Sequence, residues 1–216
     1  MEPVYGVSAQ EARVEVAGRV LRLHVLDDDA LLDALIDEGE EDFDARNPYF
    51  GQVWPAAHAL AARLAEGGSL AGVHVLDLGC GPGLVGIVAA GLGARVTLAD
   101  VVPEAVALAA ENARLNGETV EAVRLDLRDA AALGTRFDLV VASDVLYERP
   151  LAEAVPAAIA ALLAPGGRAL VADPLRPHRE AFERAAAAAG LSVAHEERAA
   201  PGPRGPVRVR ISTLAR

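Results

Sequence analysis

Four glycines that follow an apolar run constrain this chain more than any other feature. Residues 74–78 have the alternating apolar character of a buried strand, and residues 84–92 have the composition of a helix. The glycines of this stretch are Gly79, Gly81, Gly83 and Gly86. A strand, a glycine turn and a helix in this order bring backbone N–H groups close to a ligand at the helix N-terminus. The stretch therefore predicts a ligand-binding turn in an α/β sheet.

Two carboxylates near these glycines indicate which ligand the turn holds. Gly81, Gly83 and Gly86 match the dinucleotide fingerprint G-x-G-x-x-G, but the match begins two residues after the predicted strand ends. Asp77 lies in the last part of that strand, where it would repel a pyrophosphate but could hold a cationic amino-acid group. The next predicted strand, residues 95–99, is followed by Asp100, which is placed to accept hydrogen bonds from ribose hydroxyls. A ligand with adenine, ribose and a cationic amino-acid tail is S-adenosylmethionine.

At this point the sequence resembles the class I, or seven-strand, methyltransferases, whose first motif is an acidic residue followed by G-x-G-x-G. The resemblance covers residues 47–216. It implies an α/β fold with a Rossmann-like, doubly wound sheet of seven strands, mostly parallel, in which a final hairpin (residues 191–194 and 207–212) supplies the one antiparallel strand. It also implies S-adenosyl-L-methionine as cofactor and S-adenosyl-L-homocysteine as product.

Residues 1–46 lie outside the resemblance and are predicted to form a separate N-terminal extension. Residues 13–16 and 20–25 alternate around Ala17-Gly18-Arg19, which predicts a hairpin. Asp28 or Asp29 could cap a short helix. The apolar residues of that helix would be Leu31, Leu32, Leu35 and Ile36. The acidic run from Glu38 to Asp44 is either a solvated loop or a rim that attracts a basic substrate.

Further strands are predicted at residues 120–125, 137–142 and 168–172, and helices at 56–66, 103–116, 151–163 and 178–189. Acidic residues stand at or just after the strand ends: Asp77, Asp100, Asp126, Asp144 and Asp173. Ligands of open parallel sheets bind beyond the carboxyl ends of the strands. Five carboxylates at one edge therefore predict the position of the site.

The cofactor contacts follow from this edge. Gly79, Gly81 and Gly83 would let the backbone approach the amino-acid and ribose parts of the cofactor. Asp126 or the backbone of Leu127 would border the adenine. Cys80, in the glycine turn, and Ser143, after the strand at residues 137–142, are also expected in the cofactor site. Cys80 is expected to be a small filler rather than a nucleophile, because no histidine lies nearby in sequence to activate its thiol.

Two further motifs resemble methyltransferase family 16, which contains many protein-lysine methyltransferases. Ser143-Asp144-Val145-Leu146-Tyr147 looks like the D-x-x-Y motif after the fourth strand, and Trp54-Pro55-Ala56-Ala57 looks like the helix start before the first motif. In that family the tryptophan borders the cofactor. The resemblance implies that Asp144 and Tyr147 are catalytic, with the carboxylate directing a lysine ammonium and the ring facing the amine. Leu127 departs from the family, since several members carry an aromatic residue near the adenine.

Several alternatives stay open. The acceptor could be a small molecule rather than a protein. A nicotinamide-dependent oxidoreductase and a non-catalytic cofactor-binding module are alternatives from other classes. Asp144 could instead cap the helix that follows, and Tyr147 could be a packed aromatic residue. Trp54 could be a core anchor.

Composition narrows the expected partners. The net charge is −11 and every basic residue is arginine, with no basic patch evident along the chain, which argues against nucleic acid as a partner. A protein substrate is expected and a small molecule is left open. There is no apolar span of membrane length, so no membrane contact is expected. One cysteine, Cys80, fits a reducing cytoplasm, and the scattered histidines predict no metal site. The sequence does not indicate an oligomeric state.

Overall fold

The computed structural model describes residues 4, 6–27, 29–31, 33 and 48–216. The acidic run from Glu38 to Asp44 and most of the predicted short helix, including Asp28, lie outside these residues. Of that helix's predicted apolar side chains, Leu32, Leu35 and Ile36 also lie outside them. Leu31 is described, and its side chain is buried beside Leu26.

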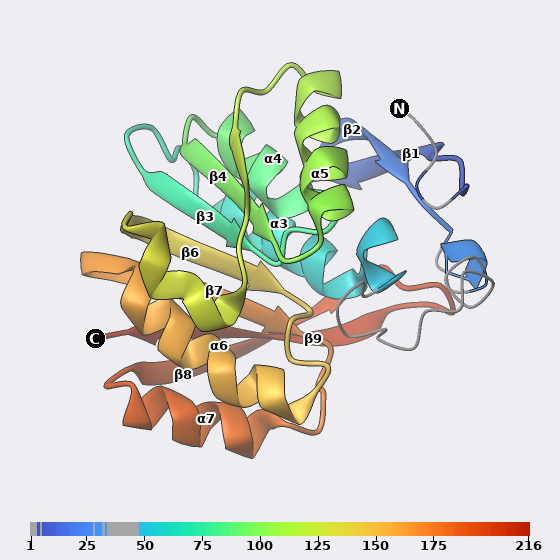
Figure 1. The fold of residues 1–216 in the computed structure, drawn as a ribbon. Coiled ribbons are helices and arrows are strands. Elements are labelled where there is room, and N and C mark those ends of the chain that lie inside the picture. The colour runs from blue at the N-terminus through green and yellow to red at the C-terminus, as the bar shows by residue number, and fades with distance from the viewer. Residues whose placement is uncertain (1–3, 5, 28, 32, 34–47) are drawn as a thin grey trace.

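A seven-stranded sheet forms the centre of the molecule, in the order β5-β4-β3-β6-β7-β9-β8. The strands are β3 (His74–Leu78), β4 (Arg95–Asp100), β5 (Glu121–Arg124), β6 (Phe137–Ser143), β7 (Leu163–Asp173), β8 (Ser192–Ala200) and β9 (Val207–Ala215). The pairs from β5 to β7 are parallel, and β9 runs antiparallel to both β7 and β8 (Figure 1). The chain order reverses between β3 and β6, which is where such sheets bind ligands. The predicted fold class is confirmed.

Helices cover both faces of the sheet because successive strand residues point to opposite sides. On β3, Val75 packs into one hydrophobic cluster and Leu76 into the other. The first cluster is covered by α3 (Pro55–Glu66), α4 (Leu84–Gly91) and α5 (Pro103–Leu115), and the second by η2 (Leu127–Leu133), α6 (Arg149–Leu162) and α7 (Arg179–Ala188) (Figure 1). Buried on both faces, the central strands are mostly apolar, although β3 also contains Asp77 and β6 contains Asp138.

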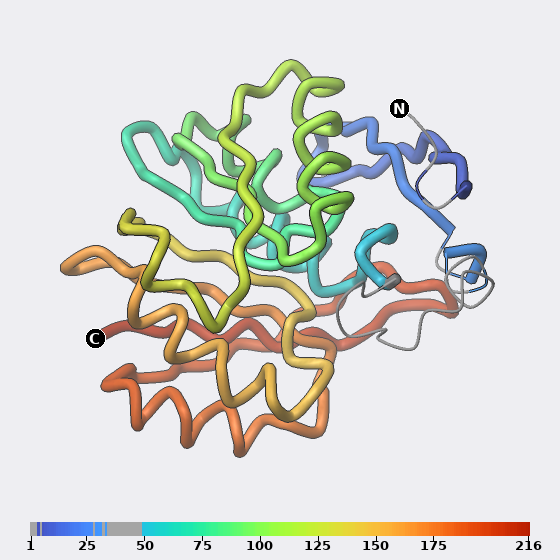
Figure 2. The backbone as a smooth tube through the Cα atoms, viewed as in Figure 1, coloured from blue at the N-terminus to red at the C-terminus, as the bar shows by residue number. Residues whose placement is uncertain are grey.

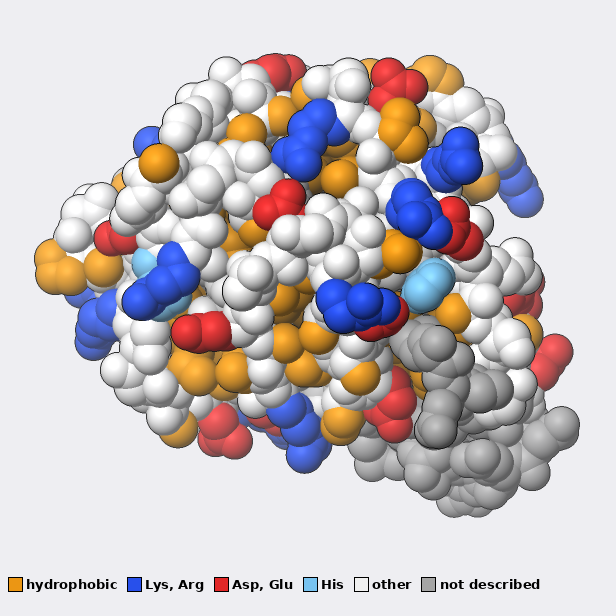
Figure 3. Space-filling model, turned by 90° about the horizontal axis from the view of Figure 1, so that it is seen from above, with side chains coloured by type: hydrophobic (Ala, Val, Ile, Leu, Met, Phe, Trp, Pro, Cys, Tyr) orange, Lys and Arg blue, Asp and Glu red, His pale blue; other side chains and the backbone are white. Residues whose placement is uncertain are grey.

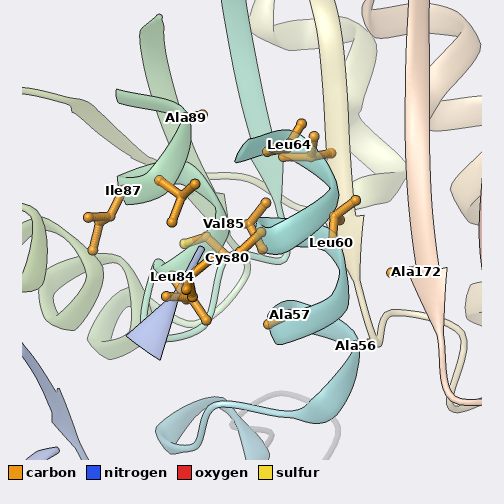
Figure 4. Close-up of a cluster of buried hydrophobic side chains, with 14 of the residues drawn as sticks. Ala56, Ala57, Leu60, Leu64, Cys80, Leu84, Val85, Ile87, Ala89 and Ala172 are labelled. Carbon is orange, nitrogen blue, oxygen red and sulfur yellow. The ribbon is translucent and has the colours of Figure 1, made fainter. Parts of the chain in front are cut away.

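Helix α3 packs against the glycine turn through small side chains. Its first residue is Pro55, whose fixed φ suits the first helical turn. Ala57 and Leu60 of α3 face Cys80 and Val85 in the first cluster (Figure 4). The alanines let the helix approach closely, so the residues just before α3, including the short helix η1 (Pro48–Gly51), reach the edge where the parallel strands end.

The predicted N-terminal hairpin is confirmed as β1 (Gln10–Val16) paired with β2 (Arg19–Val25) around a left-handed turn at Ala17 and Gly18. Its inward side chains, Val14 and Leu23 among them, belong to the same core cluster as α3 and α4. Asn112 of α5 fixes it, accepting from the His24 N–H at 2.7 Å and donating to the His24 carbonyl at 2.9 Å. The hairpin lies beside α5 (Figure 2). A boundary at residue 46 remains a prediction.

Within the seven-stranded sheet, three strand limits differ from the sequence-based ones by three residues or more. β7 begins at Leu163, where residue 168 was expected, and β8 and β9 continue to Ala200 and Ala215. β8 and β9 continue because residues 192–200 pair with 207–215 over their whole length, and β7 begins early because Leu163 pairs with Phe137 of β6. Local composition does not report such pairing. Within the described part of the chain, no helix combines the length and apolar character needed to cross a membrane.

Candidate active site

A cavity of about 400 Å³ opens at the carboxyl edge of the sheet. Its walls come from the 49–54 segment, the glycine turn, the ends of β4 and β6, and the loops that begin at Leu125 and Ser143. These elements are far apart in sequence and meet because parallel strands end at one edge. Most lining side chains are apolar, with a few polar groups between them, which is typical of cofactor sites.

The glycine turn has no room for side chains at its closest approach. Gly79 has φ +69°, and a Cβ there would lie 2.7 Å from Cγ1 of Val145. The N–H groups of Gly79 and Cys80 both donate to the carbonyl of Ala99, at 2.8 and 3.0 Å. The turn is thus bonded to β4, and Gly79, Cys80 and Gly81 line the cavity while Gly83, the N-cap residue of α4, does not.

Asp100 connects the turn to the cavity wall. One carboxylate oxygen accepts from the Gly81 N–H at 3.0 Å and the other from the Val102 N–H at 3.1 Å. Burial raises the pKa of this carboxyl group, and the bonds from Gly81 and Val102 partly oppose that rise. Asp100 lines the cavity, as the sequence predicts for a ribose-binding group. Each oxygen has a second lone pair with which to accept from a ligand hydroxyl.

Asp77 lies inside β3 and does not line the cavity. Its Oδ2 accepts from the Gly86 N–H at 2.8 Å, and its Oδ1 is buried without a hydrogen-bond partner. Burial raises the pKa of Asp77 to about 7. A Cβ on Gly86 would lie 3.1 Å from this carboxylate and 2.2 Å from Cδ2 of Leu98. Asp77 therefore fixes α4 relative to β3.

Of the two residues expected near the adenine, the structure places only Leu127 at the cavity. Asp126 instead caps η2, accepting from the Arg128 N–H at 2.9 Å, and its carboxylate also pairs with the Arg128 side chain. This hydrogen-bonded pairing lowers the pKa of Asp126. The apolar wall at this end is completed by Leu125 and Val101.

Asp144 is buried at the cavity and holds a two-pronged ion pair with Arg176. The guanidinium donates from Nε and Nη2 to Oδ1 at 3.0 Å and from Nη2 to Oδ2 at 3.1 Å. Burial raises the pKa of Asp144, and Arg176 opposes that rise. The alternative of a helix cap is wrong, since the N-cap residue of α6 is Glu148.

Backbone strain accompanies this ion pair. In the described part of the chain three non-glycine residues have positive φ: Ala17 in the hairpin turn, Asp144 (φ 55°) and Leu175 (φ 61°). Aspartate tolerates this region, but leucine rarely adopts it. Strained residues of this kind cluster at functional sites, where the surrounding structure holds them in place. Asp144 and Leu175 lie on either side of the contact between the β6 and β7 loops.

The remaining predicted site residues meet at the cavity. Trp54, Ser143 and Tyr147 all line it. The Trp54 side chain is 37% exposed, and its Nε1 donates to the Tyr49 carbonyl at 3.0 Å, so it is not a buried core anchor. Cys80 is buried, and burial raises the pKa of its thiol well above the usual range, which agrees with a filler role.

Several lining residues were not singled out from the sequence, Tyr49 and Phe50 among them. Tyr49 and Phe50 precede α3 and carry no motif, although their closeness to Trp54 was a usable signal. For Arg176 the sequence left two interpretations open, a residue lining the substrate channel or part of the turn that ends the fifth strand, and the structure places it at the cavity. Its N–H donates to Oδ1 of the strand-end residue Asp173 at 2.5 Å. Its distance of 32 residues from Asp144 left the ion pair invisible in the sequence.

Comparison with known proteins agrees with this geometry. Residues 75–167 match the family model of a methyltransferase domain. A 16S rRNA methyltransferase of T. thermophilus, solved with AdoMet and guanosine, superposes with a TM-score of 0.69 at 20% identity, over 96% of this chain and 50% of that one. The fold is that of S-adenosylmethionine-dependent methyltransferases.

Two curated relatives extend the comparison. A ribosomal protein L11 methyltransferase of Parasynechococcus marenigrum is 39% identical over 106 residues, which are 46% of this chain and 36% of the relative. A ubiquinone biosynthesis O-methyltransferase of Xanthomonas euvesicatoria is 40% identical over 100 residues, 46% of this chain and 42% of the relative. The matched region therefore spans less than half of these relatives. Neither match specifies methyltransferase family 16.

Proposed function

We propose that this chain is an S-adenosylmethionine-dependent methyltransferase. The observation that supports this most is that the glycine turn and Asp100 meet at one cavity in a methyltransferase fold. Asp100 would accept from the ribose, and Leu127 would pack on the adenine. Gly79, Gly81 and Ser143 would surround the amino-acid part, with Trp54 at its border. When bound, the cofactor supplies an electrophilic methyl group on a sulfonium.

The work left to the protein is positioning and electrostatics. Methyl transfer is an in-line displacement that needs a neutral nucleophile held close to the methyl carbon. We propose Asp144 and Tyr147 as the groups that orient the acceptor, because both lie on the cavity wall. Asp77 is proposed as a positioning residue that acts through Gly86 and α4 rather than by contact with the cofactor.

The proposed acceptor from the family 16 resemblance is a lysine side chain of a protein. Its ammonium would donate to Asp144 and lose a proton to water before transfer. Because Arg176 already holds Asp144 with two donors, lysine would have to share this carboxylate.

The proposed compartment is the cytoplasm, because a chain whose one cysteine is Cys80 fits a reducing environment.

A low-mass acceptor is a second candidate, and the same ion pair favours it. Asp144 is neutralised within the protein by Arg176, so the cavity does not require a cationic acceptor to balance a buried charge. Such an acceptor would enter without a protein partner.

Parallel calorimetric titrations with S-adenosylmethionine, S-adenosylhomocysteine and NADH test the proposal. Binding of both sulfur ligands and not of NADH is expected, whereas binding of NADH alone would overturn the methyltransferase assignment. Incubation of a lysate with the protein and tritium-methyl cofactor then separates the acceptors. Label in alkali-stable protein bands supports lysine, and label only in the low-mass fraction supports a small acceptor. Binding without any transfer would favour a non-catalytic module.

A further inference from the structure

A second cleft, of about 450 Å³, adjoins the cofactor cavity and is lined by arginines. Its basic residues, here called the arginine cleft, are Arg149, Arg176, Arg179, Arg184 and Arg210, with His178 beside them. They come from the start of α6, the loop after β7, α7 and β9. Arg176 lines both this cleft and the cofactor cavity, so the two spaces meet at that side chain. We propose that the arginine cleft binds a carboxylate or phosphate group of a low-mass methyl acceptor.

The arginines are held in place by carboxylates, and only one of those carboxylates, Glu180, lines the cleft. Nε of Arg149 is 2.9 Å from Glu153, and Nε of Arg179 is 2.5 Å from Glu183. A guanidinium has five N–H donors, and pairs of this kind use one or two. Anchoring therefore limits the motion of the side chains while leaving donors for a ligand.

Arg176 is held by Asp144 at 3.0 Å, whereas Arg184 and Arg210 make longer pairs. Arg210 lies 3.7 Å from both Asp173 and Glu197, and Arg184 lies 3.5 Å from Glu180. These distances exceed those of charge-assisted hydrogen bonds. The Arg210 side chain is only 12% exposed, so its charge is poorly screened by water. An oxyanion in the cleft would give these guanidinium groups a closer partner.

The N-terminus of α7 points to the same ligand independently. The N-cap residue is His178, whose side chain makes no capping hydrogen bond, and the first-turn residues Glu180 and Ala181 line the cleft. The first N–H groups of a helix have no partner within it, and the helix dipole favours an anion there. Leu175, the residue before Arg176, has φ 61° and also lines the cleft.

Charge elsewhere favours a small anionic group over a polyanion. The chain has 31 acidic and 20 basic residues, and five of those 20 gather in this cleft. On the face shown in Figure 3 basic and acidic side chains are interspersed without a patch of one sign. Nucleic-acid binding relies on contacts with many phosphates along a basic surface. The cleft corrects the sequence-based expectation that the basic residues would not cluster.

The inference rests on the proposed function, and one set of titrations tests the anion site in the cleft separately from the methyltransferase assignment. Inorganic phosphate and malonate would be titrated at low ionic strength into the full-length protein saturated with S-adenosylhomocysteine. The variant R179Q/R184Q changes two exposed α7 residues. Its matched control is R114Q, an exposed helical arginine paired with Glu111 at 2.7 Å and absent from the cleft.

We expect at least one anion to bind the wild type and R114Q equally, and R179Q/R184Q to bind it at least ~10-fold more weakly. The tighter of the two anions identifies the acceptor group as phosphate or carboxylate. S-adenosylhomocysteine should bind all three proteins alike. If S-adenosylhomocysteine does not bind the wild type, the proposed function is refuted. If S-adenosylhomocysteine binds but neither phosphate nor malonate does, only the proposal of an anion site in the cleft is refuted. A single-stranded RNA that binds at physiological salt and is lost in R179Q/R184Q would overturn the low-mass acceptor.

Discussion

The two walls of the cofactor cavity are built on different principles. On one wall, the glycine turn and Asp100 are joined by hydrogen bonds to backbone N–H groups, within a span of about two dozen residues. On the other, Asp144 depends on a side-chain pair with Arg176, which lies in the loop after another strand. Backbone donors are fixed by the fold, whereas a side-chain pair can exchange its partner. We infer that the first wall serves the constant ligand, the cofactor, and the second serves the acceptor.

Removing Asp100 should break the first wall and give the largest effect. Asp100→Ala deletes the acceptor of the Gly81 and Val102 N–H groups and of the expected ribose hydroxyls. We expect S-adenosylhomocysteine to bind about 100-fold more weakly, or about 3 kcal/mol, in calorimetry. Asp100→Asn is the matched control, since it keeps the shape and one acceptor oxygen and should lose less. Unchanged affinity in folded Asp100→Ala, judged by circular dichroism, would show that the ribose lies elsewhere.

Changes in the second wall should alter the coupling between Asp144 and Arg176 rather than the affinity for the cofactor. A double-mutant cycle of Asp144→Ala and Arg176→Ala should give about 2 kcal/mol of interaction in the free energy of unfolding, because each single change leaves a buried or half-buried charge unpaired. Urea unfolding measures it. S-adenosylhomocysteine affinity should stay constant while methyl transfer falls. If Asp144→Ala weakened cofactor binding as much as Asp100→Ala does, the division between the walls would be wrong.

The sequence predicted the elements of the fold better than the orientation of individual side chains. The glycine turn and the strand–helix alternation are encoded by local patterns, whereas the antiparallel last strand was implied by the resemblance to class I methyltransferases; the structure contains all three. Asp77 and Asp126 were expected at the cavity because both stand near strand ends. The pleat turns Asp77 toward Gly86, and Arg128, two residues on, draws Asp126 into a cap. Periodicity does not resolve these orientations, and it does not predict the ion pair between Arg176 and Asp144.

Asp77 lies behind the first wall, where it accepts from the Gly86 N–H of α4, and it provides a test by pH. Burial raises its pKa to about 7, above that of an unfolded chain, so the folded state binds more protons over the interval between the two values. The free energy of unfolding should therefore fall as pH rises, by about 1 kcal/mol per unit between pH 5 and 6 from this group. Asp77→Asn should flatten that slope in urea unfolding at several pH values. An identical slope in Asp77→Asn would assign the dependence to other buried carboxyls, such as Asp100.

The smallest effect on stability and cofactor affinity is expected at Asp126, which tests where the first wall ends. Asp126→Asn keeps an oxygen that can cap η2 and removes only the charge paired with an Arg128 side chain that is 82% exposed. Exposed pairs contribute about 0–1 kcal/mol, so stability should change little. Since Asp126 does not line the cavity, S-adenosylhomocysteine affinity should stay within about 2-fold of the wild type. Leu127→Ala, one residue on, removes a lining side chain and should weaken binding measurably. If Asp126→Asn weakened binding more than Leu127→Ala does, the start of η2 would have to rearrange on ligand binding so that the Asp126 carboxylate reaches the adenine.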